Sequence, residues 1–218
     1  MSYIQIAVDG PAGSGKSTIA KKIADRLNIT YIDTGAMYRA LTYKVLINNI
    51  GVENEDAVIE LARKSKIEFL KNNIYLDDDI VNEEIRLPEV SKNVSYVAKI
   101  PQVRKILVDT QRKLALNQDV VMDGRDIGTY VLKDANFKIF LTATVEERSH
   151  RRYLELKNKG LDVTLDDVKK DIINRDKIDR EREFSPLVEA DDAIIIDTTD
   201  LSIEDVVNKI TSILEEGH

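Results

Sequence analysis

Short runs of β-branched and aromatic residues alternate along the chain with segments whose apolar residues recur at helical spacing. The runs predict five strands, over residues 3–8, 30–33, 119–123, 137–141 and 193–197. The periodic segments predict a helix with apolar residues from Ile19 to Leu27, and further helices over about 35–49, 145–157, 165–177 and 203–215. Because strands that alternate with helices form right-handed crossovers, we expect a parallel sheet covered by helices.

One stretch departs from this alternation. Residues 66–70 and 74–76 have strand composition and are separated by turn residues 71–73, which predicts an antiparallel hairpin. A second turn at 77–79 precedes a short apolar pair at 80–81. We therefore expect two or three short antiparallel strands in a small subdomain over about residues 63–100.

The composition is that of an ordinary globular protein, with 43% hydrophobic and 33% charged residues in a chain of 218. The absence of Cys excludes disulfides, and two His residues argue against a zinc site. The net charge of −7 argues against a nucleic-acid partner. No apolar run approaches the ~18 residues of a membrane span, and the first residues lack a signal-peptide pattern. We therefore expect a cytoplasmic protein without a membrane partner.

A phosphate-binding motif directly follows the first predicted strand. Its pattern is G-x-x-x-x-G-K-[ST], and it has the required strand before it and helix after it. Glycines allow backbone N–H groups to surround phosphate oxygens, and the positive end of the following helix points at the same oxygens. The ATP-binding residues expected here are Gly10, Pro11, Ala12, Gly13, Ser14, Gly15, Lys16, Ser17 and Thr18.

Within this loop, Lys16 is expected to act in catalysis by bridging the β- and γ-phosphates, and Ser17 to hold Mg²⁺. The third predicted strand runs into Asp123-Gly-Arg-Asp126, at the edge where a parallel sheet places its ligands. Asp123 and Asp126 are both candidates to assist Mg²⁺ through water or to bind a substrate, and the residues alone leave the choice open.

Arginines gather near the predicted strand ends and over residues 148–182, although the chain as a whole is acidic. Guanidinium groups bind phosphate oxygens bidentately and offset the charge of a phosphoryl donor, its acceptor and the transition state. Together they predict an anionic acceptor beside the ATP. The set comprises Arg39, Arg104, Arg125, Arg148, Arg151, Arg152, Arg175, Arg180 and Arg182.

These motifs resemble those of the bacterial cytidylate kinases, a branch of the nucleoside monophosphate kinases. The matching segments run in order over nearly the whole chain. They are DGPAGSGKST (9–18), DTGAMYR (33–39), NVS (93–95), PQVR (101–104), DGRDIGT (123–129), KIFL (138–141), ERSHRR (147–152) and RDKIDRER (175–182). The resemblance implies transfer of a phosphoryl group from Mg·ATP to CMP or dCMP, giving ADP and CDP or dCDP.

The resemblance also implies roles for individual residues. The CMP-binding set comprises Thr34, Tyr38, Arg39, Ser95, Arg104, Arg125, Asp126, Arg175, Asp179 and Arg182. Of these, Ser95 and Arg104 would read the cytosine edge, Arg175 and Asp179 would contact the sugar, and Arg39, Arg125 and Arg182 would hold the acceptor phosphate. The resemblance also implies a mobile lid over the donor, formed by Arg148, Arg151 and Arg152. The residues that it implies for catalysis are Lys16, Arg125, Arg148 and Arg152.

We therefore expect a three-layer α/β/α P-loop kinase fold with a five-stranded parallel sheet, a small antiparallel hairpin insert and a helical lid. The single domain would have its core at 1–62, 101–147 and 183–218, a CMP-binding insert at about 63–100, and the lid with its following helix at 148–182. We expect a monomer. A P-loop kinase for another small acceptor (UMP, AMP or shikimate) is the alternative. The arginine-rich acceptor side argues against a switch or motor ATPase.

Overall fold

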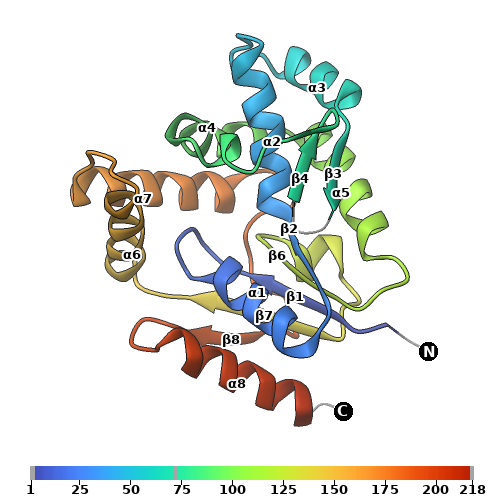
Figure 1. Ribbon diagram of the computed structural model, residues 1–218, viewed down its shortest axis with the longest axis vertical. Helices are drawn as coiled ribbons and strands as arrows, with labels where there is room; N and C mark the ends of the chain where they lie inside the picture. The colour runs from blue at the N-terminus through green and yellow to red at the C-terminus, as the bar shows by residue number, and fades with distance from the viewer. Residues whose placement is uncertain (1–2, 71–72, 217–218) are drawn as a thin grey trace.

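The computed structural model describes residues 3–70 and 73–216. Its centre is a five-stranded parallel sheet with the strand order β2-β6-β1-β7-β8 (Figure 1). The strands are β1 (Gln5–Asp9), β2 (Thr30–Asp33), β6 (Val120–Gly124), β7 (Phe137–Thr142) and β8 (Ile194–Asp197). All of them match strands predicted from the sequence, and no bound differs by more than two residues.

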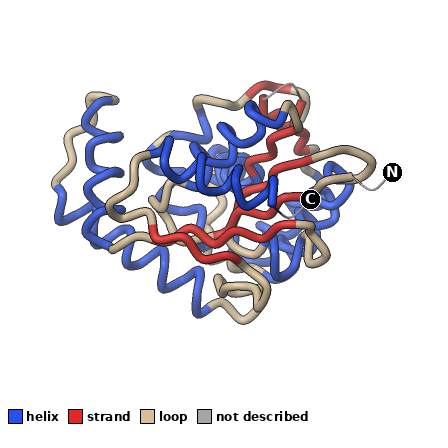
Figure 2. Tube along the Cα trace, turned by 90° about the horizontal axis from the view of Figure 1, so that it is seen from below, coloured by secondary structure: helices blue, strands red, loops and turns tan. Residues whose placement is uncertain are grey.

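Both faces of this sheet are covered, as Figure 2 shows from below. Along β1, Ile6 and Val8 pack under α1 (Lys16–Leu27) and α8 (Ile203–Glu216). Ala7 points the other way, into a second hydrophobic cluster with α5 (Pro101–Ala115) and the helical turn η2 (Ile127–Val131). Alternate residues of one strand therefore fill two cores, because successive strand side chains point to opposite faces. The expected three-layer architecture is confirmed.

A second unit stands on the β2 side of the sheet. It contains α2 (Thr34–Ile47), α3 (Glu55–Lys64), β3 (Ile67–Leu70), β4 (Asn73–Leu76), β5 (Asp79–Ile80), η1 (Glu84–Arg86) and α4 (Pro88–Ala98). The predicted hairpin is present as the antiparallel sheet β3-β4-β5, although the turn at 71–72 lies outside the described residues. One hydrophobic cluster runs from Ala36 to Leu107, so the packed unit reaches beyond the expected insert at 63–100 on both sides.

Two helices project on the left of Figure 1, and the second of them contacts α4 of the second unit. They are α6 (Val145–Asn158) and α7 (Leu165–Glu181), and α7 continues four residues beyond its predicted end at 177. Each begins at a threonine N-cap: the Glu147 N–H donates to Thr144 Oγ1, and the Asp167 N–H donates to Thr164 Oγ1. Within the described residues, no helix is both long and apolar enough to cross a bilayer.

Candidate active site

The loop between β1 and α1 has the backbone shape that a phosphate-binding loop needs. Gly13 and Gly15 have φ of 76° and 88°, in the left-handed region that glycine adopts without strain. At Gly10, whose φ is 147°, an added Cβ would lie 2.0 Å from the carbonyl oxygen of Leu141. Lys16 Nζ donates to the Pro11 carbonyl at 2.6 Å, and burial lowers the Lys16 pKa well below its usual value.

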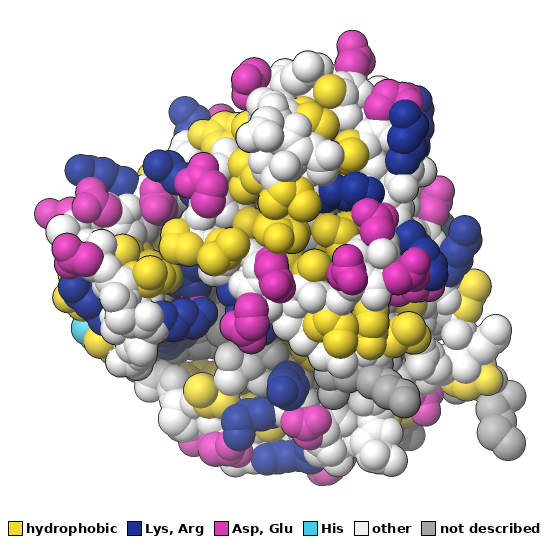
Figure 3. All heavy atoms as spheres, turned by 45° about the horizontal axis from the view of Figure 1, so that its top comes forward, with side chains coloured by type: hydrophobic (Ala, Val, Ile, Leu, Met, Phe, Trp, Pro, Cys, Tyr) yellow, Lys and Arg dark blue, Asp and Glu magenta, His cyan; other side chains and the backbone are white. Residues whose placement is uncertain are grey.

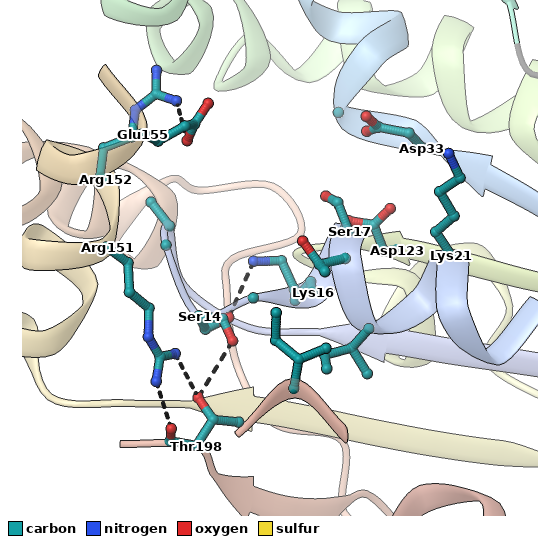
Figure 4. Close-up of a pocket in the computed structure, with 18 of the residues that line it drawn as sticks. Ser14, Lys16, Ser17, Lys21, Asp33, Asp123, Arg151, Arg152, Glu155 and Thr198 are labelled. Carbon is teal, nitrogen blue, oxygen red and sulfur yellow. Dashed lines mark hydrogen bonds and ion pairs between the residues drawn. The ribbon is translucent and has the colours of Figure 1, made fainter. Parts of the chain in front are cut away.

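Ser17 lies beside one of the two candidate aspartates. Its hydroxyl donates to Asp123 Oδ2 at 2.9 Å (Figure 4). The Tyr31 hydroxyl donates to Asp123 Oδ1 at 2.8 Å. Burial, helped by the charge of Asp33, raises the pKa of Asp123 to about 6. Asp123 therefore stands beside Ser17, whereas Asp126 pairs with Arg104, and a role for Asp123 at Mg²⁺ stays a prediction.

Hydroxyl and carboxylate oxygens fit a Mg²⁺ ion, which is commonly bound through one or two carboxylates together with substrate phosphates. Among residues 3–70 and 73–216, no group of three or more His, Cys, Asp or Glu side chains could form a metal cage by itself. The donor set at Ser17 and Asp123 therefore suits a metal that arrives with phosphate ligands.

A large cleft opens in front of the phosphate loop, with a volume of about 1380 Å³. In the space-filling view, Lys and Arg side chains lie around the hollow between the α6–α7 side and the α8 side (Figure 3). The arginines that line the cleft are Arg39, Arg86, Arg125, Arg151, Arg152 and Arg175. Most of the cationic groups predicted from the sequence to surround phosphates therefore do share one cavity.

The segment 198–203 also lines this cleft, and sequence reasoning missed it. Arg151 fixes its start, since its guanidinium donates to Thr198 Oγ1 at 3.0 Å and to the Thr198 carbonyl at 2.6 Å (Figure 4). No recognisable motif marks this segment. The segment follows the last strand of a parallel sheet, and ligands bind at the carboxyl ends of such strands. That position is the one feature of the sequence that could have indicated its place in the cleft.

A smaller pocket of about 70 Å³ adjoins the cleft, between the sheet edge, α2, α4 and α7. Every residue that the resemblance assigned to CMP lines it: Thr34, Tyr38, Arg39, Ser95, Arg104, Arg125, Asp126, Arg175, Asp179 and Arg182. These residues come from five stretches of the chain. The structure brings the whole predicted set together; what the set binds stays a prediction.

Carboxylates pair with most of the guanidinium groups of this pocket. Arg104 is 1% exposed and forms a short ion pair with Asp126. Arg125 Nε donates to Asp179 Oδ2 at 2.9 Å. These buried pairs hold the guanidinium planes in fixed directions, which is what bidentate recognition of a phosphate or a base edge requires.

Arg175 differs from the other arginines of the pocket, because no described carboxylate lies within ion-pair distance of it. Its Nε is also buried without a hydrogen-bond partner among the described residues, as is Arg104 Nε. Burial and the nearby charge of Arg125 lower the Arg175 pKa to about 10. Because guanidinium groups stay charged in proteins, Arg175 keeps a buried positive charge. A bound anion would stabilise this charge.

The structure places one predicted lid residue differently. Arg148 is 4% exposed and lies against the phosphate loop, where its guanidinium donates to the carbonyls of Ala12 and Ala143 and to Asp176. It does not line the cleft. Arg152 does line it, beside Glu155 at 2.7 Å. The expected direct catalytic contact is therefore supported by position for Arg152 and not for Arg148.

Comparison with known proteins identifies the lineage. The family model described as cytidylate kinase matches residues 6–216. The chain belongs to this cytidylate kinase family. A cytidylate kinase of Alkaliphilus oremlandii (strain OhILAs) is 67% identical over 215 residues, covering 99% of both chains. One from Clostridioides difficile (strain 630) is 59% identical, over 97% of this chain and 98% of that one.

A solved structure of shikimate kinase from Bacteroides thetaiotaomicron aligns with a TM-score of 0.52 at 16% identity, over 98% of this chain and 99% of that chain. This likeness shows the P-loop kinase fold and nothing about the acceptor. As a member of the cytidylate kinase family, the chain is an enzyme, a nucleoside monophosphate kinase.

Proposed function

We propose that this enzyme transfers the γ-phosphoryl group of ATP to the phosphate of CMP or dCMP, giving ADP and CDP or dCDP. The observation that carries the proposal is the adjacency of two cavities, a phosphate-loop cleft and a pocket that is lined by paired guanidinium groups. Gly35, Arg39, Arg125 and Arg175 line both cavities, so they would lie between donor and acceptor.

The reaction would proceed by attack of an acceptor phosphate oxygen on the γ-phosphorus, while the bond to the β,γ-bridging oxygen breaks and ADP leaves. Lys16 would leave the Pro11 carbonyl and follow the transferring group. Arg125 and Arg152 would stabilise the negative charge on the equatorial oxygens. Catalysis then rests on positioning and electrostatics, which dominate phosphoryl transfer.

Ser17 and Asp123 would hold Mg²⁺, Ser17 directly and Asp123 through water. When bound, Mg²⁺ would neutralise charge on the β- and γ-phosphate oxygens. The hydrogen bond from Tyr31 fixes the Asp123 carboxylate from its other side.

Ser95, Arg104 and Asp126 would read the pyrimidine. All three are nearly fully buried in the small pocket. Cytosine offers an amine donor and two acceptors on one edge, and a carboxylate beside a hydroxyl and a guanidinium can meet these groups. Uracil replaces the amine by a carbonyl and would face the Asp126 carboxylate.

The test is an ADP-release assay with Mg·ATP and separate acceptors CMP, dCMP, UMP, AMP and shikimate. We expect CMP and dCMP to give the highest kcat/KM. Faster turnover of UMP, AMP or shikimate would replace the proposed acceptor, and ADP release independent of any acceptor would favour a hydrolase.

A further inference from the structure

One residue of the phosphate loop, Ala12, is held from outside the loop at both of its peptide groups. The Ala12 N–H donates to Asp176 Oδ1 at 3.2 Å, and the Ala12 carbonyl accepts from Arg148 Nη1 at 2.9 Å. The same Arg148 nitrogen donates to Asp176 Oδ2 at 2.5 Å. Arg148 is 4% exposed and Asp176 is 9% exposed. The two side chains thus form a buried clamp on both peptide groups of one loop residue.

Backbone packing extends this contact to the next residue. A Cβ added at Gly13 would lie 3.0 Å from the Arg148 carbonyl oxygen and 3.1 Å from Arg148 Cβ. Arg148 is itself fixed, because its Nε donates to the Ala143 carbonyl at 3.0 Å. Ala12 and Gly13 therefore cannot shift without moving α6 or losing these contacts.

The other half of the clamp belongs to the helix that carries acceptor-pocket residues. Asp176 lies on α7 between Arg175 and Asp179, both of which line the small pocket. Asp179 also accepts a hydrogen bond from Arg125. Residues one position apart on a helix point about 100° apart, so α7 can contact the donor loop and the acceptor pocket at once.

We propose that Arg148 and Asp176 are positioning residues, which fix the phosphate loop through Ala12 and couple its geometry to occupancy of the acceptor pocket. An acceptor that pulls Arg175 and Asp179 inward would shift α7 and, with it, Asp176 and the Ala12 peptide. Lys16 Nζ donates to the carbonyl of Pro11, the residue before Ala12. The same shift would therefore move Lys16, whose ammonium group must follow the γ-phosphate. This inference rests on the proposed function.

The test measures binding of β,γ-imido-ATP by calorimetry, with and without saturating CMP, in the wild type, Asp176→Asn and Arg148→Met/Asp176→Asn. Asn preserves the side-chain volume, and the double variant leaves no buried charge unpaired. We expect CMP to tighten analogue binding about 5-fold or more in the wild type, and this ratio to approach one in both variants. CMP alone should bind within about 3-fold of wild type, and kcat should fall about 10-fold or more.

The matched control is Lys169→Met. Lys169 joins the same two helices by an exposed ion pair with Glu146 at 2.7 Å, away from the loop, so its loss should leave the CMP effect unchanged. A clamp that is only structural would lower the melting temperature while keeping the ratio. Retention of the ratio in both variants, or its absence in the wild type, overturns the coupling. Wild-type turnover of CMP, measured separately, decides the proposed function itself.

Discussion

The donor loop and the acceptor pocket are built by opposite means. The loop is nine consecutive residues, 10–18, and it presents backbone N–H groups, left-handed glycines and one lysine. The pocket draws side chains from residues 34 to 182, and it presents guanidinium groups held by buried carboxylates. Its cationic groups reach it only when the chain has folded.

This difference predicts which kinetic constant a substitution in each region should change. Backbone donors and a lysine that follows the transferring phosphate contribute mainly in the transition state, so damage there should lower kcat. Guanidinium groups aimed at a bound acceptor contribute already in the ground state, so damage there should raise the acceptor KM. The predictions below test this division, from the largest effect to the smallest.

Lys16→Met should produce the largest loss. Removing one oriented charge from a transferring phosphate costs on the order of 10²–10³-fold in kcat, and Lys16 carries the only side-chain cation of the loop. Because its pKa is already lowered by burial, its removal should leave the melting temperature nearly unchanged. Steady-state kinetics and thermal unfolding measure the two quantities.

Arg26→Met is the control for this change, since Arg26 lies exposed in the last turn of the same helix. It should leave kcat unaffected. A Lys16 variant with near wild-type kcat and a raised ATP KM would show that the loop lysine only binds the donor, and the division between the two regions would fail.

Arg175→Met should act on the acceptor instead. Its guanidinium has an unpaired Nε and lines both cavities, so its loss removes a charge-assisted contact of about 1.5–3 kcal/mol. We expect the CMP KM to rise about 10- to 100-fold and the ATP KM to change little. The exposed Arg180→Met on the same helix is the control. Equal losses for both substrates would place Arg175 on the transferring group.

Ser95→Ala should have a smaller effect that is confined to the base. Ser95 is 4% exposed and lines the small pocket, and one neutral hydrogen bond contributes about 0.5–1.5 kcal/mol. The CMP kcat/KM should fall about 3- to 10-fold. Lys92→Ala, at an exposed position of the same helix, should leave it unchanged. The kcat/KM of the Ser95 variant should fall by the same factor for CMP and for UMP. An unchanged kcat/KM for CMP would show that Ser95 does not contact the acceptor.

The two regions also differ in how far the sequence predicts them. The donor loop is a contiguous motif with a fixed mechanism, and each of its residues lies where the motif places it. The acceptor set was identified through resemblance, because residue types spread over 34–182 carry no local pattern. Spacing alone could not show which way Arg148 faces on α6; the structure buries it against Ala12.

The sequence predicts α2 but not α3, α4 or α5, for a different reason. The strand composition within residues 63–100 predicts a hairpin, although α4 and α5 each begin with a proline at the first helical turn. Pro88 and Pro101 are common helix-start signals and could have located both helices. The full extent of that unit depends on tertiary packing and cannot be predicted from local sequence. Helices α2 and α5 contribute to its core from outside the hairpin stretch.

Asp9, at the end of β1, contacts the start of η2 and gives a prediction of a different kind, a pH dependence of stability. Its carboxylate accepts the N–H groups of Ile127 at 2.8 Å and Gly128 at 2.7 Å. Burial nevertheless raises the Asp9 pKa from 3.8 to about 7, against the lowering effect of these hydrogen bonds. The folded state therefore holds this proton more tightly than the unfolded state.

A raised pKa fixes the sign of the linkage: the stabilisation from the bound proton is complete below pH ~4 and is lost as pH rises through about 7. Asp9→Asn cannot titrate, so the wild-type free energy of unfolding should decline relative to the variant's across this window. Urea unfolding at intervals between pH 4 and 8 measures the difference. Parallel curves would mean that the two backbone hydrogen bonds outweigh burial and keep Asp9 ionised. The contact between β1 and η2 would then carry a negative charge over the whole pH range.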